Sequence, residues 1–179
     1  MARNVEIKAF APNFTEVMNK AKSLTADEPE TIEQTDVFFK TDRGRLKLRF
    51  LSPTRGELIF YERADQAGPK MSVYAIYLTG NPLDLRAVLS ATYGEDVTVE
   101  KVRTLFLVGK TRVHLDDVRH LGRFVELEVV LEDGQAAEEG IAEAHRLMDE
   151  LGIRQENLID GAYADLLRSK QPVGWVSEA

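Results

Sequence analysis

Glu126 and Glu128 lie two residues apart in the stretch 124–131, where polar and apolar residues alternate. Such alternation predicts a β-strand with one apolar face and one face that carries both carboxylates. Surface strands often have this pattern, so the pair alone does not define a site. Many other segments of the chain repeat the pattern, and their polar faces are rich in Arg, Lys and Glu. Adjacent carboxylates facing a set of cations indicate one cavity that a divalent cation and a polyanion share.

The charged residues of these polar faces form a basic set and an acidic set. Burying both sets together is costly unless the charges pair with one another or bind a ligand. Arg and Lys suit phosphate oxygens, and carboxylates suit Mg²⁺ or Mn²⁺, so a polyphosphate with a hard divalent cation would satisfy both sets. The cations are Lys8, Arg45, Lys47, Arg49, Arg63, Lys101, Arg103 and Arg112; the carboxylates are Glu6, Glu57, Asp116, Glu126 and Glu128, and Asp36 could be a sixth.

Simpler interpretations stay open for each of these groups. The basic segment that begins at Arg45 could be a solvated strand face, and the glutamate pair could lie on the surface. His114 could be a structural, hydrogen-bonding histidine rather than a catalytic base. Tyr61 and Tyr163 could serve packing alone. No P-loop, His-x-x-x-His or Ser/His/Asp pattern offers a competing chemistry in the sequence.

Composition narrows the class of protein. A chain of 179 residues, 44% hydrophobic and 30% charged, suits a globular domain with a sizeable core. The net charge of -7 argues against a general nucleic-acid binder, and the lack of cysteine excludes disulfides and thiolate metal sites. No apolar run approaches the ~20 residues that span a bilayer, and no signal peptide is recognisable at the N-terminus. We therefore expect a cytoplasmic protein without a membrane or nucleic-acid partner.

The order of the expected elements repeats once along the chain. A strand, a helix and three strands are followed by the same five elements, although no residue-level repeat is visible. Two further helices end the chain. The expected strands are residues 4–10, 31–40, 45–50, 57–63, 71–79, 97–108, 111–116 and 124–131; the expected helices are residues 14–26, 82–93, 135–151 and 158–170.

Eight strands that each have a charged and an apolar face predict an α+β fold with a closed antiparallel β-barrel. The charged faces would line the lumen of this tunnel. The helices, each with one apolar stripe, would cover the apolar outer surface. We expect a single domain over residues 1–170 and a flexible C-terminal tail, residues 171–179, which contains Trp175.

Short motifs follow one another in a specific order from Asn4 to Leu167. They are Asn4-Val5-Glu6-Ile7-Lys8, Gly44-Arg45-Leu46-Lys47-Leu48-Arg49, Tyr61-x-Arg63, Lys101-x-Arg103, Phe106-Leu107-Val108-Gly109, His114-Leu115-Asp116, Leu121-Gly122-x-Phe124, Glu126-Leu127-Glu128 and Gly161-Ala162-Tyr163-x-x-Leu166-Leu167. Together they resemble the CYTH superfamily of class IV adenylate cyclases, thiamine triphosphatases and other triphosphate tunnel metalloenzymes. The middle and distal motifs are most similar to the class IV cyclase-like branch.

The resemblance implies roles for the charged residues. All eight cations named above would bind triphosphate oxygens. Glu57 and Asp116 could bind metal, position water or form salt bridges in the lumen. Divalent metal, Mg²⁺ or Mn²⁺, would be held by Glu6, Glu126 and Glu128. The residues that would act in catalysis are Glu6, Lys8, Arg49, Glu126 and Glu128.

The expected activity is metal-dependent hydrolysis of a phosphoanhydride in a nucleoside or inorganic triphosphate. An alternative is a class IV adenylate cyclase that converts ATP to cyclic AMP and pyrophosphate; hydrolysis is favoured because no adenine-recognition motif is visible. A second alternative is a catalytically silent polyphosphate- or nucleotide-binding module, and a third is a structural barrel. The partner would be a triphosphate-containing small molecule, and the protein would be a monomer or homodimer.

Asn4 departs from the family pattern, which has an acid at the first position of the N-terminal signature. An amide oxygen can bind a cation but brings no charge, so this chain lacks one negative charge at the metal site. Replacing Asn4 by Glu is expected to tighten binding of Mn²⁺ or Mg²⁺ in a metal titration. Unchanged affinity would contradict a ligand role for position 4.

Overall fold

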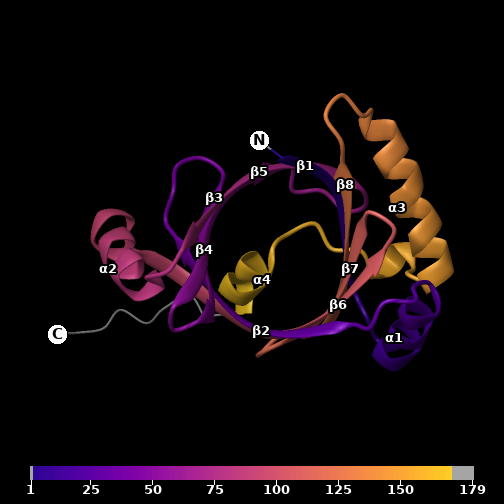
Figure 1. Ribbon diagram of the computed structural model, residues 1–179, viewed down its shortest axis with the longest axis horizontal. Coiled ribbons are helices and arrows are strands. Elements are labelled where there is room, and N and C mark those ends of the chain that lie inside the picture. Colours follow the sequence, from indigo (N-terminus) through magenta and orange to yellow (C-terminus); the bar gives the residue numbers. More distant parts are fainter. Residues whose placement is uncertain (1, 171–179) are drawn as a thin grey trace.

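In the computed structural model, which describes residues 2–170, eight antiparallel strands close into a barrel (Figure 1). The strand order around the barrel is β1-β5-β4-β3-β2-β6-β7-β8. The predicted fold is therefore confirmed, and every predicted strand is present to within two residues at either end. The strands are β1 (Ala2–Phe10), β2 (Glu30–Phe39), β3 (Arg45–Ser52), β4 (Arg55–Arg63), β5 (Lys70–Thr79), β6 (Glu95–Val108), β7 (Thr111–Val118) and β8 (Gly122–Leu131).

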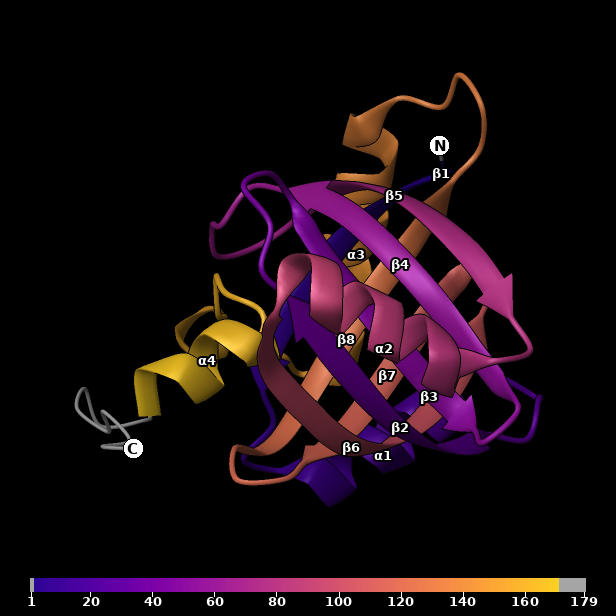
Figure 2. The same ribbon diagram turned by 90° about the vertical axis from the view of Figure 1, so that its left-hand side faces the viewer.

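Four α-helices accompany the barrel in the described residues, and α2 lies along its outer surface in Figure 2. Helix α3 packs on β1 and β8, α1 packs on α3, β6 and β7, and α2 packs on β2, β3 and β4. None of these helices has the length and apolar composition to cross a membrane. The helices are α1 (Phe14–Ser23), α2 (Pro82–Tyr93), α3 (Ala137–Leu151) and α4 (Tyr163–Lys170); a short 3₁₀ turn spans Gln155–Asn157.

The prediction of a final helix from residue 158 was wrong at its start, because α4 begins at Tyr163. Leu158 instead forms an isolated antiparallel bridge with Ala9, and the Ile159 backbone N–H donates to the Lys8 carbonyl. These contacts with β1 hold the segment extended, and a tertiary contact of this kind overrides local helix propensity. The expected tail, residues 171–179, lies outside the described residues.

The predicted repeat of architecture is present in the barrel. The units β1-α1-β2-β3-β4 and β5-α2-β6-β7-β8 are arranged so that the first strand of each pairs with the last strand of the other. In hairpin β2–β3, Asp36 lies opposite Arg49, and in hairpin β6–β7, Arg103 lies opposite Asp116. The two units therefore place equivalent ion pairs in the lumen with the signs exchanged.

The largest apolar core lies outside the barrel wall, where β1, β7 and β8 meet α1 and α3. Its residues come from the apolar strand faces, such as Ile7 and Leu127, and from the helix stripe that includes Leu147 and Leu151, all of them fully buried. Smaller clusters lie under α2 and around α4. The apolar faces thus point to the helices, and this leaves the polar faces for the lumen.

Replacing Gly140 by Ala is expected to destabilise the protein by about 1–2 kcal/mol, although Ala favours a helix over Gly by about 1 kcal/mol. A Cβ atom at Gly140 in α3 would lie 2.7 Å from Leu131 Cδ2 and 2.8 Å from Val5 Cγ2, so α3 would have to move off the wall. Denaturant unfolding measures the effect. Ala142→Gly, on the exposed side of α3, controls for propensity, and a stabilised Gly140→Ala variant would contradict this account of the packing.

Candidate functional site

All eight strands contribute to a cavity of about 590 Å³ inside the barrel. Ten of the eleven predicted site residues line it, from Glu6 and Lys8 on β1 to Glu126 and Glu128 on β8. Arg45 is the exception. Its guanidinium lies at one end of the barrel, where it donates to Asp65 Oδ1 at 2.8 Å and to Asp165 Oδ2 at 2.9 Å.

Helix α4 lies at the end of the barrel where Arg45 is found, and Figure 1 shows it within the barrel outline. Tyr163, its first residue, reaches into the cavity and donates its hydroxyl proton to Asp116 Oδ2 at 2.8 Å. The Lys8 ammonium lies 3.7 Å from the centroid of the Tyr163 ring, close enough for a cation–π interaction. Tyr163 is thus a lumen residue as well as a packing residue.

The opposite end of the cavity contains apolar side chains among its lining residues. Glu30, where β2 begins, lies opposite Leu105 of β6, so these residues mark the end of the barrel away from α4. Leu105 lines the cavity together with Ile32, Leu51 and Ile76, and Ile76 is about half exposed. Glu30 also lines the cavity, so apolar and charged side chains lie together at this end.

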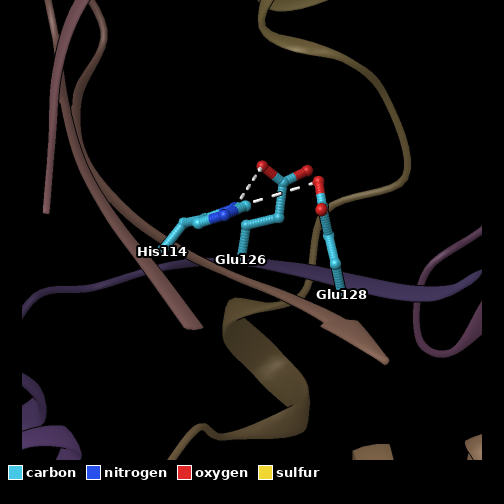
Figure 3. Close-up of side chains that lie close together, drawn as sticks. All are labelled: His114, Glu126 and Glu128. Atoms are coloured by element: carbon cyan, nitrogen blue, oxygen red, sulfur yellow. Dashed lines mark ion pairs between the residues drawn. The ribbon is translucent and has the colours of Figure 1, made fainter. Parts of the chain in front are cut away.

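The side chains of His114, Glu126 and Glu128 converge in the cavity (Figure 3). His114 on β7 lies opposite Glu126 on β8, and Glu128 follows on the same face of β8. The Nδ1 atom of His114 lies 3.7 Å from Glu126 Oε2 and 3.8 Å from Glu128 Oε1, and the three ligand atoms lie within 4.8 Å of one another. On β1, Glu6 lies opposite Glu128.

The two carboxylates of β8 already have cationic partners. Lys8 Nζ donates to Glu126 Oε1 at 2.7 Å, and Arg103 Nη2 donates to Glu126 Oε2 at 2.8 Å. Arg112 Nε donates to Glu128 Oε2 at 2.8 Å. Burial opposes ionisation of Glu126, but the charges of Lys8 and Arg103 hold its pKa well below the usual value. Glu126 therefore stays anionic and available to a metal ion at neutral pH.

The negative charge of Glu6 is less well balanced by neighbouring cations than the charges of the β8 carboxylates. Its nearest cation is Arg63, whose Nη1 lies 3.5 Å from Glu6 Oε2. Burial, followed by the charge of Glu126, raises the pKa of Glu6 above its usual value. A divalent cation near Glu6 and the β8 carboxylates would relieve this repulsion. Among the described residues, the group whose ligand atoms lie within 4.8 Å of one another is His114, Glu126 and Glu128, so the structure does not bring Glu6 into that group.

Two fully buried aspartates hold the cations of the lumen in position. Asp36 accepts from Lys47 Nζ at 2.8 Å and from Arg49 Nε at 2.8 Å. Asp116 accepts from Arg103 at 2.7 and 2.6 Å through two nitrogens. Bonds of this kind fix the guanidinium planes before any ligand arrives.

Two lumen cations retain unused capacity. Within residues 2–170, the Nε and Nη1 atoms of buried Arg63 have no hydrogen-bond partner. Lys101 Nζ lies 3.7 Å from the nearest oxygen of Asp36 and 4.0 Å from that of Asp116, so neither contact is a hydrogen bond. Burial, with the neighbouring Arg103, lowers the pKa of Lys101 to about 7. An anion bound between Arg63 and Lys101 would satisfy both groups.

Lys70 was not among the predicted residues, because the strand was expected to begin at Met71. Lys70 is buried opposite Glu6, and its ammonium donates to the Gln66 carbonyl at 2.9 Å. Burial and the nearby Arg63 lower its pKa to about 8. Its even spacing from Ser72 and Tyr74, which line the cavity, is the signal that could have placed it on the polar face.

The comparisons with known proteins agree with this fold. The PH1012 protein of Pyrococcus horikoshii OT3 superposes with a TM-score of 0.81 at 21% identity, over 91% of this chain and 98% of that chain. A putative adenylate cyclase of Vibrio parahaemolyticus gives a TM-score of 0.73 at 18% identity, over 92% and 97%. A putative adenylyl cyclase from Hippeastrum, described as having dominant triphosphatase activity, gives 0.63 at 17% identity, over 94% and 96%.

These identities are low enough that the structural likeness speaks for the fold alone. No curated protein sequence matched the chain. The family model described as CYTH domain matches residues 2–163, which cover every strand of the barrel and the first residue of α4. The chain therefore belongs to the CYTH domain family.

Proposed function

We infer that this protein is a divalent-metal-dependent enzyme that hydrolyses the terminal phosphoanhydride of a triphosphate in its tunnel. One observation carries this proposal: buried cations, with Arg63 and Lys101 incompletely paired, lie beside a buried cluster of carboxylates. A triphosphate and a divalent cation together complement both sets of charges. Membership of the CYTH domain family supports the proposal, and so do structural neighbours of this chain that are described as a putative adenylate cyclase and as having triphosphatase activity.

Each set of residues has a distinct part in the proposed reaction. Arg49 and Arg103, held by their aspartates, together with Arg63 and Lys101, bind phosphate oxygens and orient the chain of phosphates. Glu6, Glu126 and Glu128 would hold Mg²⁺ or Mn²⁺. The metal, when bound, neutralises charge that develops on the phosphate oxygens. Water attacks the terminal phosphorus, the anhydride P–O bond breaks, a diphosphate leaves, and the proton of the water passes to the surrounding solvent.

A second candidate is cyclisation of a nucleoside triphosphate, in which the 3′-hydroxyl attacks the α-phosphorus and pyrophosphate leaves. Apolar side chains in the cavity support the nucleoside binding that this reaction requires, because Ile32, Leu51, Ile76 and Leu105 could contact the nucleoside. These side chains also suit a nucleoside triphosphate that is hydrolysed. The nature of the product, rather than the choice of substrate, distinguishes the two reactions.

Incubation of the purified protein with tripolyphosphate or ATP, and with Mg²⁺, Mn²⁺ or EDTA, tests the proposal. We expect release of orthophosphate that requires a metal. Cyclic AMP and pyrophosphate without orthophosphate would instead identify a cyclase. Tight binding of the triphosphate without turnover, whichever metal is added, would identify the protein as a binding module. Absence of both binding and turnover would overturn the proposal.

Binding of a triphosphate at pH 8 is expected to take up close to one proton at Lys101. At this pH the ammonium is mostly deprotonated in the empty lumen, because its pKa is about 7. A bound polyanion raises that pKa, so affinity falls as the pH rises above about 7, by up to about tenfold per pH unit. Calorimetric titration in two buffers with different ionisation enthalpies measures the uptake.

Lys101→Met should remove this proton uptake, whereas Lys110→Met should keep it, because Lys110 is exposed in the turn between β6 and β7. Equal uptake by the wild type and by Lys101→Met would show that another group is the acceptor.

A further inference from the structure

His114 is buried beside two carboxylates without forming a normal hydrogen bond to either. The residue is 4% exposed, and within the part of the chain that the structure describes its Nδ1 atom has no hydrogen-bond partner. Buried polar atoms are nearly always paired, and each exception calls for an explanation. The nearest carboxylate oxygens, at 3.7 and 3.8 Å, lie beyond the ~3.2 Å limit of a good N–H···O bond.

The spacing of the three groups fits a shared ion better than it fits a hydrogen-bonded triad. Ligand atoms that each lie ~2.1 Å from one ion are about 3–4 Å apart. The Nδ1 atom of His114 and the nearest oxygens of Glu126 and Glu128 approach this separation, and Figure 3 shows the three side chains pointing toward one another.

We propose that His114 is a metal ligand through Nδ1, together with Glu126 and Glu128, and that it makes the tunnel select Mn²⁺ or Co²⁺ over Mg²⁺. The presence of a metal in the tunnel rests on the proposed function. The identity of this nitrogen ligand and the resulting metal preference go beyond it.

The sheet fixes this donor set. His114 and Glu126 are directly opposed on the adjacent strands β7 and β8, and Glu128 lies two residues further on the same face. Sites on strands hold their ligands more rigidly than sites on loops. The nitrogen therefore lies in place before an ion arrives, so binding the ion requires little further ordering of the His114 side chain.

The chemistry of the donors sets the preference. Mg²⁺ favours oxygen ligands in octahedral geometry and keeps several waters, whereas imidazole suits transition-metal ions. When a nitrogen is among the atoms that bind the ion, the affinity for Co²⁺ and Mn²⁺ increases more than the affinity for Mg²⁺. A site of Glu6, Glu126 and Glu128 alone would offer only oxygens and would lack this preference.

Metal binding by the full chain, without any triphosphate, tests the proposal. Free Mn²⁺ is followed by electron paramagnetic resonance, and Mg²⁺ affinity is obtained by competition against Mn²⁺. We expect His114→Asn to lose about tenfold or more in Mn²⁺ affinity, as loss of even an outer-shell partner costs 10–100-fold, and to lose less in Mg²⁺ affinity. His114→Asp, which restores an anionic oxygen, should shift the preference toward Mg²⁺. His145→Asn, on the exposed side of α3, is the matched control.

Electron spin echo modulation of bound Mn²⁺ gives a readout that a structural role would not change. The wild type should show ¹⁴N coupling from a directly bound imidazole, and His114→Asn should lose it. Unchanged affinity and unchanged ¹⁴N coupling in that variant would overturn the proposal. So would a ratio of Mn²⁺ affinity to Mg²⁺ affinity that is the same in the wild type, His114→Asn and His114→Asp.

The outcomes also separate this proposal from the proposed function. Metal binding that requires Glu126 but is indifferent to His114 would refute the histidine ligand and leave the metal-dependent tunnel intact. A wild type that binds neither metal would refute both. Thermal unfolding of each variant confirms that a lost affinity does not come from a lost fold.

Discussion

Replacing Glu126 by Gln is expected to lower metal-dependent turnover of a triphosphate by at least about 10²-fold, the cost of one lost contact to transition-state charge. The substitution keeps the shape of the side chain and removes its charge. Glu126 is the point where the two halves of the site meet, because it accepts from Lys8 and Arg103 and contacts His114. The variant therefore loses a proposed metal ligand and leaves two phosphate-binding cations without their shared counter-ion.

Initial rates measured across a range of metal concentrations show whether excess metal rescues the variant. We expect the loss to appear both in the metal requirement and in the rate at saturation. Glu132→Gln is the matched control, since Glu132 follows β8 directly and pairs with Lys110 on the surface. A Glu126→Gln protein that remains folded and turns over within about threefold of the wild type would refute the proposed role.

The fold could be predicted because the alternation of residues carries the needed information. A strand whose odd residues are apolar and whose even residues are charged can bury only one face against a helix. Glu126 and Glu128 therefore face away from the helices, and a closed barrel turns eight such polar faces toward one lumen. Ten of the eleven predicted site residues accordingly line the cavity.

Alternation gives the face of a residue but not its depth along the barrel axis. Arg45 shares its face with Lys47 and Arg49, yet it lies at the end of the barrel, where Asp165 of α4 binds it. That partner lies 120 residues away in sequence. Depth depends on the register of each strand and on long-range contacts, so a single sequence could not show that Arg45 would be separated from the other cations.

The same limit applies to the partners of each charge. From the sequence, Asp116 could have been a metal ligand, a water-positioning residue or a salt-bridge partner. In the structure it accepts from Arg103 and Tyr163 and is fully buried. These contacts support a positioning role, in which Asp116 fixes Arg103 and links β7 to α4.

Replacing Asp116 by Asn is expected to lower the free energy of unfolding at pH 7 by about 3–5 kcal/mol, the usual cost of breaking a buried ion pair on one side. Asp116 is 0% exposed and pairs with Arg103 through two hydrogen bonds. Asn cannot balance the guanidinium charge, which then stays buried with Glu126, an acid that also pairs with Lys8, as its remaining counter-ion. Denaturant unfolding followed by circular dichroism measures the loss.

The neighbouring residue supplies the control. Asp117 points to solvent from the same strand, and its 3.2 Å contact with Arg123 joins two side chains that are each more than half exposed. Exposed pairs of this kind contribute roughly 0–1 kcal/mol, so Asp117→Asn should change stability little. Equal losses in the two variants would contradict the view that burial makes the Asp116 pair important.

The pH dependence of the free energy of unfolding tests the Asp116–Arg103 pair in a second way. Burial opposes ionisation of Asp116, but Arg103 and Lys101 hold its pKa below the usual value. The stabilisation is therefore complete above the unfolded-state pKa of about 3.9 and is lost as the pH falls through it toward the lower folded pKa. The difference in the free energy of unfolding between the wild type and Asp116→Asn should become smaller as the pH drops below about 4. A gap that stays constant down to pH 2.5 would mean that lost packing, rather than lost charge, destabilises the variant.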